Sequence, residues 1–244
     1  IGYSFYENKI TAIMSSNNKE CDFANNIILQ LLSFYTYEDL KFVLITSKNR
    51  EYKWDYFKYL NHSFSNDKSF RYFASDNESI KKLNDVLQYE FNQRLNNDNS
   101  SKKPQYFIIV DGYDNIRRYD IVKNISECEE NLGFNVLILD KKISKLPSKC
   151  DNIIVLNEDK CEILEDIYEN QKQTSFIDES KKNIDMMHYS KVLSNIPIEF
   201  DEGNKNIPDM VTFLEMEKVG KVEQLNIQNR WQTNDSTQSL KAEV

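Results

Sequence analysis

A continuous run of apolar and aromatic residues that ends on an aspartate constrains the fold of this chain more than any other feature. Tyr106 to Val110 are all apolar or aromatic, and Asp111 follows them directly. A run of this kind is typical of a strand buried on both faces, as in parallel sheets. Open α/β sheets bind their ligands beyond the carboxyl ends of such strands, so Asp111 is the first candidate site residue.

Apolar segments alternate with segments of helical spacing along the first part of the chain. The predicted strands are residues 9–14, 40–46, 70–74, 105–111, 134–139 and 152–156, with an edge strand at 161–167. The predicted helices are residues 23–35, 79–94 and 121–131, and Gly133 is expected as the C′ residue of the last one. We therefore expect a mostly parallel, doubly wound α/β sheet over residues 1–170. Its first two strands should form a parallel pair with a right-handed crossover.

Composition limits the functions that such a sheet can carry. The 244 residues include only 5 Gly, whereas loops that hold phosphate with backbone amides need clustered glycines. The net charge of −8, with Lys and Arg spread along the chain, argues against a nucleic-acid-binding face. With 2 His, and 4 Cys that lack CxxC spacing, we expect no metal site and no catalytic residue in this chain.

The turn after the first strand is where a phosphate-binding loop is expected, with the pattern G-x-x-x-x-G-K-[ST]. Here Ser15 and Glu20 stand in place of the two glycines. Cys21 stands in place of the lysine, and Asp22 in place of the hydroxyl that binds Mg²⁺. Two carboxylates at a helix N-terminus suit the helix dipole but repel a triphosphate. Lys19 is a displaced lysine without flanking glycines. The predicted degenerate nucleotide site consists of Lys19, Cys21, Asp22 and Asp111.

Asp111 has two interpretations at this stage. In a P-loop NTPase the aspartate at the end of this strand holds Mg²⁺. A hydrolytic site also needs a second carboxylate to activate water, but Gly112 stands there, and Asp114 is only a displaced candidate. In the alternative interpretation, Asp111 and Asp114 cap the turn that follows. We prefer the alternative, because both halves of the nucleotide site are degraded together.

An aromatic segment at residues 54–62 follows the second strand. Its bulky members include Trp54, Tyr56, Tyr59 and His62. Aromatic residues at this density form either the core of a loop, which is the more common case, or a contact surface for a partner. The four residues are therefore candidates for an interaction surface.

Beyond residue 170 the chain changes character. Residues 186–193 predict a helix, and residues 196–208 contain two prolines and a glycine, which is typical of a linker. Residues 207–231 are too apolar for a solvated linker and too short to form a core alone. We expect Phe213 and Trp231 to pack on the sheet domain or on a following domain. Residues 171–244 are interpreted as a helical and extended linker into that domain.

Three segments carry a resemblance to a known family. The aromatic segment 54–62 (WDYFKYLNH) resembles the W-x-W-x-x-W-L-P-H segment of type VII secretion motor ATPases, the EssC/EccC family, with Asn61 in place of the proline. Tyr56 and Tyr59 replace two tryptophans of that segment. Residues 27–40 (IILQLLSFYTYEDL) are similar to its llxQLaxxhsxxDl segment, and residues 207–231 to the segment that leads into the first motor ATPase. The resemblance covers nearly the whole chain, and the EssC form of Firmicutes fits better.

The resemblance implies a membrane-anchored, FtsK/SpoIIIE-like motor with tandem ATPase domains that exports small helical WXG100 proteins. It implies that this chain is the degenerate P-loop ATPase-like domain between the transmembrane helices and the first motor ATPase. That domain is cytoplasmic and has no cofactor of its own, since ATP and Mg²⁺ belong to other domains. The implied partners are those domains, membrane components of the secretion system, a ubiquitin-like subunit and, indirectly, WXG100 proteins.

Two functional hypotheses follow. In the first, the chain is a non-catalytic module that couples the membrane anchor to the motor and docks other secretion components. In the second, it is a weak or regulatory ATP-binding or ATP-hydrolysing domain of the same motor. A DNA translocase module, by analogy with FtsK, is disfavoured by the net charge of −8.

Overall fold

The computed structural model describes residues 2–15, 19–97, 102–157, 160–165, 172–178, 184–196, 220–226 and 228–229. The chain divides into two compact units, Ile1–Ile196 and Pro197–Val244. The sequence placed this boundary near residue 170, but a strand and a helix beyond that position belong to the first unit. The described part of the second unit includes a short 3-10 helix, η6 (Val222–Leu225). Phe213 and Trp231 lie outside the described residues.

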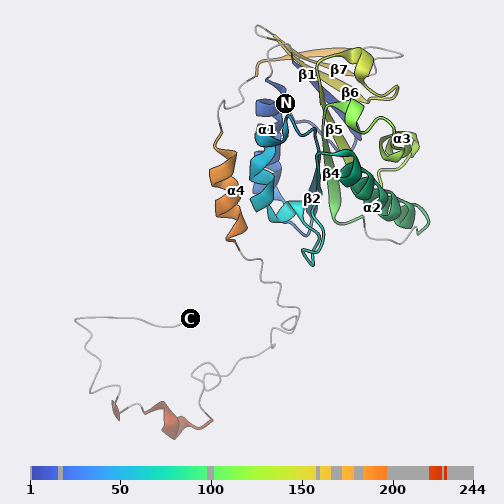
Figure 1. The fold of residues 1–244 in the computed structure, drawn as a ribbon. Helices are drawn as coiled ribbons and strands as arrows, with labels where there is room; N and C mark the ends of the chain where they lie inside the picture. Colours follow the sequence, from blue (N-terminus) through green and yellow to red (C-terminus); the bar gives the residue numbers. More distant parts are fainter. Residues whose placement is uncertain are drawn as a thin grey trace. The chain divides into compact units, whose positions relative to one another are not determined.

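A sheet of eight described strands forms the centre of the first unit (Figure 1). In chain order the strands are β1 (Ile10–Ser15), β2 (Leu40–Ile45), β3 (Phe73–Ala74), β4 (Gln105–Asp111), β5 (Phe134–Asp140), β6 (Asn152–Leu156), β7 (Cys161–Glu165) and β8 (Lys172–Phe176). Their spatial order is β3-β2-β4-β5-β1-β6-β7-β8. The first six strands pair in parallel, and β7 pairs antiparallel with β6 and β8. The expected mostly parallel α/β sheet is confirmed.

Three details of the sheet differ from the expectation. β1 and β2 are not neighbours, because β4 and β5 lie between them. The third strand is only two residues long, since Arg71 forms an isolated antiparallel bridge with Phe64 and does not extend it. β7 is not an edge strand, because β8 pairs along its outer side. The sequence KQTSF of β8 is polar and mostly exposed, so apolar patterning did not reveal it.

Helices cover both faces of the sheet. One face carries α1 (Glu20–Phe34), α4 (Met186–Ser194) and the 3-10 helices η1 (Glu51–Tyr59) and η2 (Asn61–Ser63). The other face carries α2 (Asn77–Leu95) and α3 (Ile121–Glu127) (Figure 1). Short 3-10 turns are also present as η3 (Tyr113–Asn115) and η4 (Ile143–Lys145). Among the described residues, no helix is long and apolar enough to cross a bilayer.

The central strand β4 contributes side chains to two separate core layers. Phe107 and Ile109 pack with α1 and η1, whereas Ile108 and Val110 pack with α2 and α3. Because both faces of the strand are covered, apolar side chains are favoured at every position between its ends, which explains its continuous apolar run. The strand ends at Asp111, which is also buried.

Arg94, at the end of α2, holds the loops that lead into β4 and β5. It is buried, and its guanidinium donates hydrogen bonds to the carbonyl oxygens of Leu132 at 2.9 Å and Pro104 at 2.9 Å. Gly133 lies beside it with φ +88, and a Cβ atom there would lie 2.4 Å from Arg94 Nη1 and 2.6 Å from the Lys102 carbonyl oxygen. The expected role of Gly133 as a helix C′ residue is wrong, because α3 already ends at Glu127. The glycine is needed where the chain enters β5 against Arg94.

We predict that Gly133→Ala lowers the free energy of unfolding more than Gly112→Ala does. Both glycines have positive φ, but a Cβ at Gly112 meets only the Asn115 side chain, at 3.2 Å. The backbone clash at Gly133 should add about 1–3 kcal/mol to the cost of the positive φ. Urea unfolding of the two variants measures the difference. Equal losses would contradict the role given to the Arg94 contact.

Candidate functional site

The candidate site lies at the carboxyl ends of the central strands, where Asp111 closes β4. The Asp111 side chain is fully buried. Its Oδ2 atom accepts hydrogen bonds from Thr46 Oγ1 at 3.1 Å and from Trp54 Nε1 at 2.9 Å. Its Oδ1 atom forms an ion pair with Arg50 Nη2 at 2.6 Å. Both oxygens of the carboxylate are therefore engaged by side chains of the protein itself.

The three residues that engage Asp111 come from one continuous piece of chain. Thr46 follows β2, Arg50 precedes η1, and Trp54 lies within η1. β2 and β4 are paired neighbours, so the end of β2 lies beside the end of β4. The chain that leaves β2 therefore folds over Asp111. Within this piece of chain, the Trp54 side chain is buried and only 1% exposed.

Arg50 also contacts the first residue of α1. Its Nη2 atom lies 3.4 Å from Glu20 Oε1, and Glu20 is 1% exposed. Burial opposes the charge on the guanidinium, but Asp111, Cys21 and Glu20 together outweigh that effect, so the pKa of Arg50 is raised. Arg50 thus links the N-terminus of α1 to the end of β4, across the position where a nucleotide-binding protein holds phosphate and Mg²⁺.

The charge of this cluster is unfavourable for a phosphate. Glu20 and Asp111 contribute two buried carboxylates, and Arg50 contributes one guanidinium. Glu20 Oε2 makes no hydrogen bond with any described residue. A triphosphate would be repelled by these two buried carboxylates in a poorly solvated place, where electrostatic interactions are strong.

Cys21 stands where a phosphate-binding loop has its lysine, but it supplies no positive charge. Its Sγ atom lies 3.8 Å from Arg50 Nη2 and 3.9 Å from Lys53 Nζ. Burial raises the pKa of the Cys21 thiol to about 11, and Asp111 raises it further against the opposing effect of Lys53. Cys21 is therefore a neutral thiol at physiological pH.

The remaining predicted site residues lie outside this cluster. Asp22 is exposed on the first turn of α1, and the Lys19 backbone amide donates to Ser15 Oγ at 3.1 Å. Residues 16–18 lie outside the described part of the chain. The structure therefore places Cys21 and Asp111 beside Arg50, whereas the Asp22 side chain faces solvent.

The aspartates after β4 do not cap the turn that follows. The Asp111 carboxylate faces Thr46, Arg50 and Trp54, and Asp114 is exposed and pairs with Lys145. The preferred interpretation of these residues as turn caps is therefore wrong. Asp114 is also no second carboxylate beside Asp111, since its side chain is held by Lys145 in solvent. Among the described residues, no three His, Cys, Asp or Glu side chains form a potential metal centre.

The aromatic segment is mostly buried. Trp54, Tyr56 and His62 are buried, and Tyr59 is half-buried. Tyr56 donates its hydroxyl hydrogen bond to Asn25 Oδ1 at 2.7 Å. His62 Nε2 lies 2.9 Å from the Tyr35 carbonyl oxygen, and burial lowers the pKa of His62. These residues form a loop core in this chain, and Trp54 belongs to the candidate site.

Sequence reasoning missed Arg50 and Thr46, and it considered Trp54 as part of a loop core or a contact surface but not as part of the site. Arg50 carries no local signal, because it lies among polar residues at 47–51 that read as an ordinary loop. Thr46 was recognised only as the end of a strand. One available signal was their position: both follow the strand that neighbours β4, at the edge where parallel strands place their ligands.

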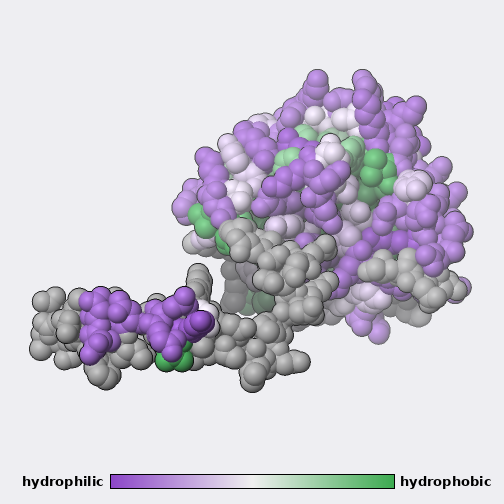
Figure 2. Space-filling model, turned by 90° about the horizontal axis from the view of Figure 1, so that it is seen from below, coloured by the Kyte–Doolittle hydropathy of each residue, from purple (hydrophilic) through white to green (hydrophobic). Residues whose placement is uncertain are grey.

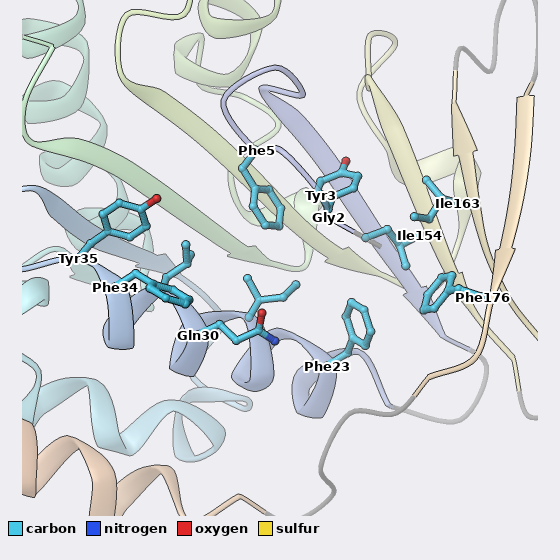
Figure 3. A pocket seen from close by; sticks show the side chains of 12 residues that line it. Gly2, Tyr3, Phe5, Phe23, Gln30, Phe34, Tyr35, Ile154, Ile163 and Phe176 are labelled. Atoms are coloured by element: carbon cyan, nitrogen blue, oxygen red, sulfur yellow. The ribbon is translucent and has the colours of Figure 1, made fainter.

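A pocket lies between α1 and the sheet, apart from the Asp111 cluster (Figure 3). This pocket has a volume of about 430 Å³ and no charged residue in its lining. Tyr3 and Phe5 approach from the N-terminal segment, Phe23 from α1, and Ile154 and Phe176 from the strands. Such a lining suits apolar groups and excludes a phosphate. The surface seen in Figure 2 is otherwise mostly hydrophilic, with small hydrophobic patches.

Comparison with curated proteins finds homologues in type VII secretion. The chain is 23% identical over 225 residues to the type VII secretion system protein EssC of Staphylococcus aureus, which covers 88% of the chain and 15% of that protein. The chain thus spans a small part of the curated relative. No family model matches the chain.

Solved structures show the same fold. The structure of EssC (ATPases 2 and 3) from Geobacillus thermodenitrificans aligns with a TM-score of 0.57 and 15% identity, over 85% of this chain and 46% of that one. The cytoplasmic domain of EssC aligns with a TM-score of 0.53 and 14% identity, over 86% of this chain and 49% of that one. The P-loop NTPase-like architecture expected from the sequence is therefore confirmed.

We predict that Cys21 resists alkylation at pH 8. With a pKa of about 11, its thiolate population is roughly 100-fold smaller than that of an ordinary exposed cysteine. Iodoacetamide labelling, followed by peptide mass spectrometry, compares Cys21 with a thiol introduced by Ser33→Cys on the exposed side of α1. The Cys21 rate should rise about tenfold for each pH unit up to about 11. Equal rates at pH 8 would contradict the described environment.

Proposed function

We propose that this chain, which is homologous to the EssC-type ATPases of type VII secretion, is a non-catalytic module of the secretion motor. The observation that carries the proposal is the ion pair between Arg50 and Asp111. Arg50 supplies to Asp111 the positive charge that Mg²⁺ supplies in a working nucleotide site. The module thereby retains the fold of a motor ATPase without its nucleotide.

Energetics favour the ion pair over a weakly bound nucleotide. Removing one partner from a buried ion pair costs about 3–5 kcal/mol. A dissociation constant of 1 mM corresponds to about −4.1 kcal/mol of binding free energy. A nucleotide that displaced Arg50 would therefore lose most of a millimolar affinity before it met Glu20. The Arg50 side chain is 28% exposed, so the low end of the ion-pair range is appropriate.

The proposed role of the module is mechanical coupling. The curated relative is several times longer than this chain, and a solved relative contains two ATPase domains in one structure. A domain that holds no nucleotide can keep one shape while its neighbours cycle. We propose that it joins the membrane anchor to the motor ATPases on the cytoplasmic side. We further propose that it docks membrane components of the system and a ubiquitin-like subunit, and thereby serves the export of WXG100 proteins.

The second candidate function is weak or regulatory nucleotide binding. It is favoured by the position of Asp111 at the end of β4, in a fold that matches motor ATPases. It requires Arg50 to leave Asp111. The two functions therefore differ in one measurable property, the affinity of the chain for Mg²⁺-nucleotide.

We predict that millimolar Mg²⁺-ATP neither raises the melting temperature of the chain nor releases heat in calorimetry. A site filled at 100 times its Kd would add about 2.7 kcal/mol to the stability. Asp114→Ala is the matched control, because it removes a neighbouring exposed carboxylate that does not contact Asp111. A thermal shift that persists in Asp114→Ala and disappears in Asp111→Ala would establish the second function.

A further inference from the structure

We propose that Asp111 fixes the position of α4, the helix at the end of the first unit, by anchoring η1 beneath it. The inference rests on the proposed function, because it requires the nucleotide position to be occupied by side chains of the chain. The side chains at the nucleotide position then have a second role. The contacts that exclude a nucleotide also hold α4, a helix that is remote from β4 in the sequence. The contacts run from Asp111 to η1 and from η1 to α4.

The first part of this path is the dependence of η1 on Asp111. The η1 segment consists of two short 3-10 helices joined by a kink at Trp54, which has non-helical angles of φ −116 and ψ 16. Its backbone alone is therefore a weak support. Asp111 holds the residue before η1 through the Arg50 ion pair, and it holds the middle of η1 through the Trp54 hydrogen bond. One carboxylate thus fixes two points of the segment.

The second part is the dependence of α4 on η1. The α4 helix packs directly against η1. Lys191 Nζ lies 5.1 Å from the centre of the Tyr59 ring in η1, and just beyond η1, Asn61 Nδ2 of η2 lies 3.5 Å from the Ser194 carbonyl oxygen. Met186, at the start of α4, is 4% exposed and belongs to the same core cluster as Trp54. A nine-residue helix does not persist alone in water, so these contacts determine whether α4 forms.

The consequence is that the contacts that hold η1 and α4 do not vary, whereas the corresponding contacts in a motor ATPase vary with the bound nucleotide. In a nucleotide-dependent domain, contacts at the end of the β4 strand change with the bound phosphate. Here the groups that contact Asp111 are side chains of the same chain, so they are present whether or not a nucleotide is bound. Asp111 therefore holds η1, and through it α4, in one arrangement that no nucleotide state alters.

Hydrogen–deuterium exchange of the chain tests this path. Trp54→Phe keeps an aromatic ring but removes the hydrogen bond to Asp111, and Asp111→Asn removes the charge of the ion pair while keeping the shape. Both variants should accelerate amide exchange in η1 and α4 at least tenfold, and leave α2 unchanged. Tyr56→Phe is the matched control. It lies in the same helix but loses only its hydrogen bond to Asn25, and it should leave α4 unchanged.

Two results would overturn the proposal. Unchanged exchange in α4, with faster exchange in η1, would show that α4 does not depend on the anchor. Equal acceleration in α2 and α4 would show that Asp111 serves the general stability of the domain. Nucleotide calorimetry tests the proposed function separately. If the chain binds no nucleotide and Asp111→Asn leaves amide exchange in α4 unchanged, this inference is refuted and the proposed function is not.

Discussion

The structure depends on the neutralisation of a buried carboxylate at the end of its central strand. Asp111 lies where the strand order of an α/β sheet brings polar groups together, and it has no access to solvent. A lone ionised carboxylate in such a place is strongly unfavourable. Motor ATPases meet this requirement with Mg²⁺ and nucleotide. This chain meets it with Arg50, Thr46 and Trp54, and the path of the chain from β2 through η1 follows from that solution.

The absence of a phosphate-binding pattern at residues 15–22 agrees with the position of Arg50. Arg50 lies between Glu20 and Asp111, and Lys53 Nζ lies 3.9 Å from Cys21 Sγ, so two cations of the chain already face the position of the missing lysine. Glu20 is tolerated at the helix N-terminus because the helix dipole and Arg50 both favour its charge. The two core layers are built from side chains of the chain itself, on both faces of the sheet.

Local patterns predicted the sheet well and the site poorly. The apolar run before Asp111 predicted β4 because that strand is buried on both faces, whereas the degenerate nucleotide position inferred from the mismatched turn stays a prediction. β8 escaped prediction because an exposed polar strand has no apolar pattern. Gly133 was wrongly assigned to a helix end. It is needed for the close approach to Arg94, and no local pattern shows that contact because Arg94 is distant in the sequence. The role of Arg50 was not predicted for the same reason. It depends on the pairing of β2 with β4, which no local sequence pattern indicates.

A double-mutant cycle between Arg50 and Asp111 tests the central claim most directly. The free energy of unfolding would be measured by urea denaturation for the unmodified chain, Arg50→Met, Asp111→Asn and the double variant. If Arg50 neutralises Asp111 in place of a ligand, the two residues should show a coupling energy of about 2 kcal/mol, largely unaffected by added salt. The double variant should be more stable than the sum of the single losses implies. A coupling energy below about 0.5 kcal/mol, the level at which distant sites are additive, would contradict the account.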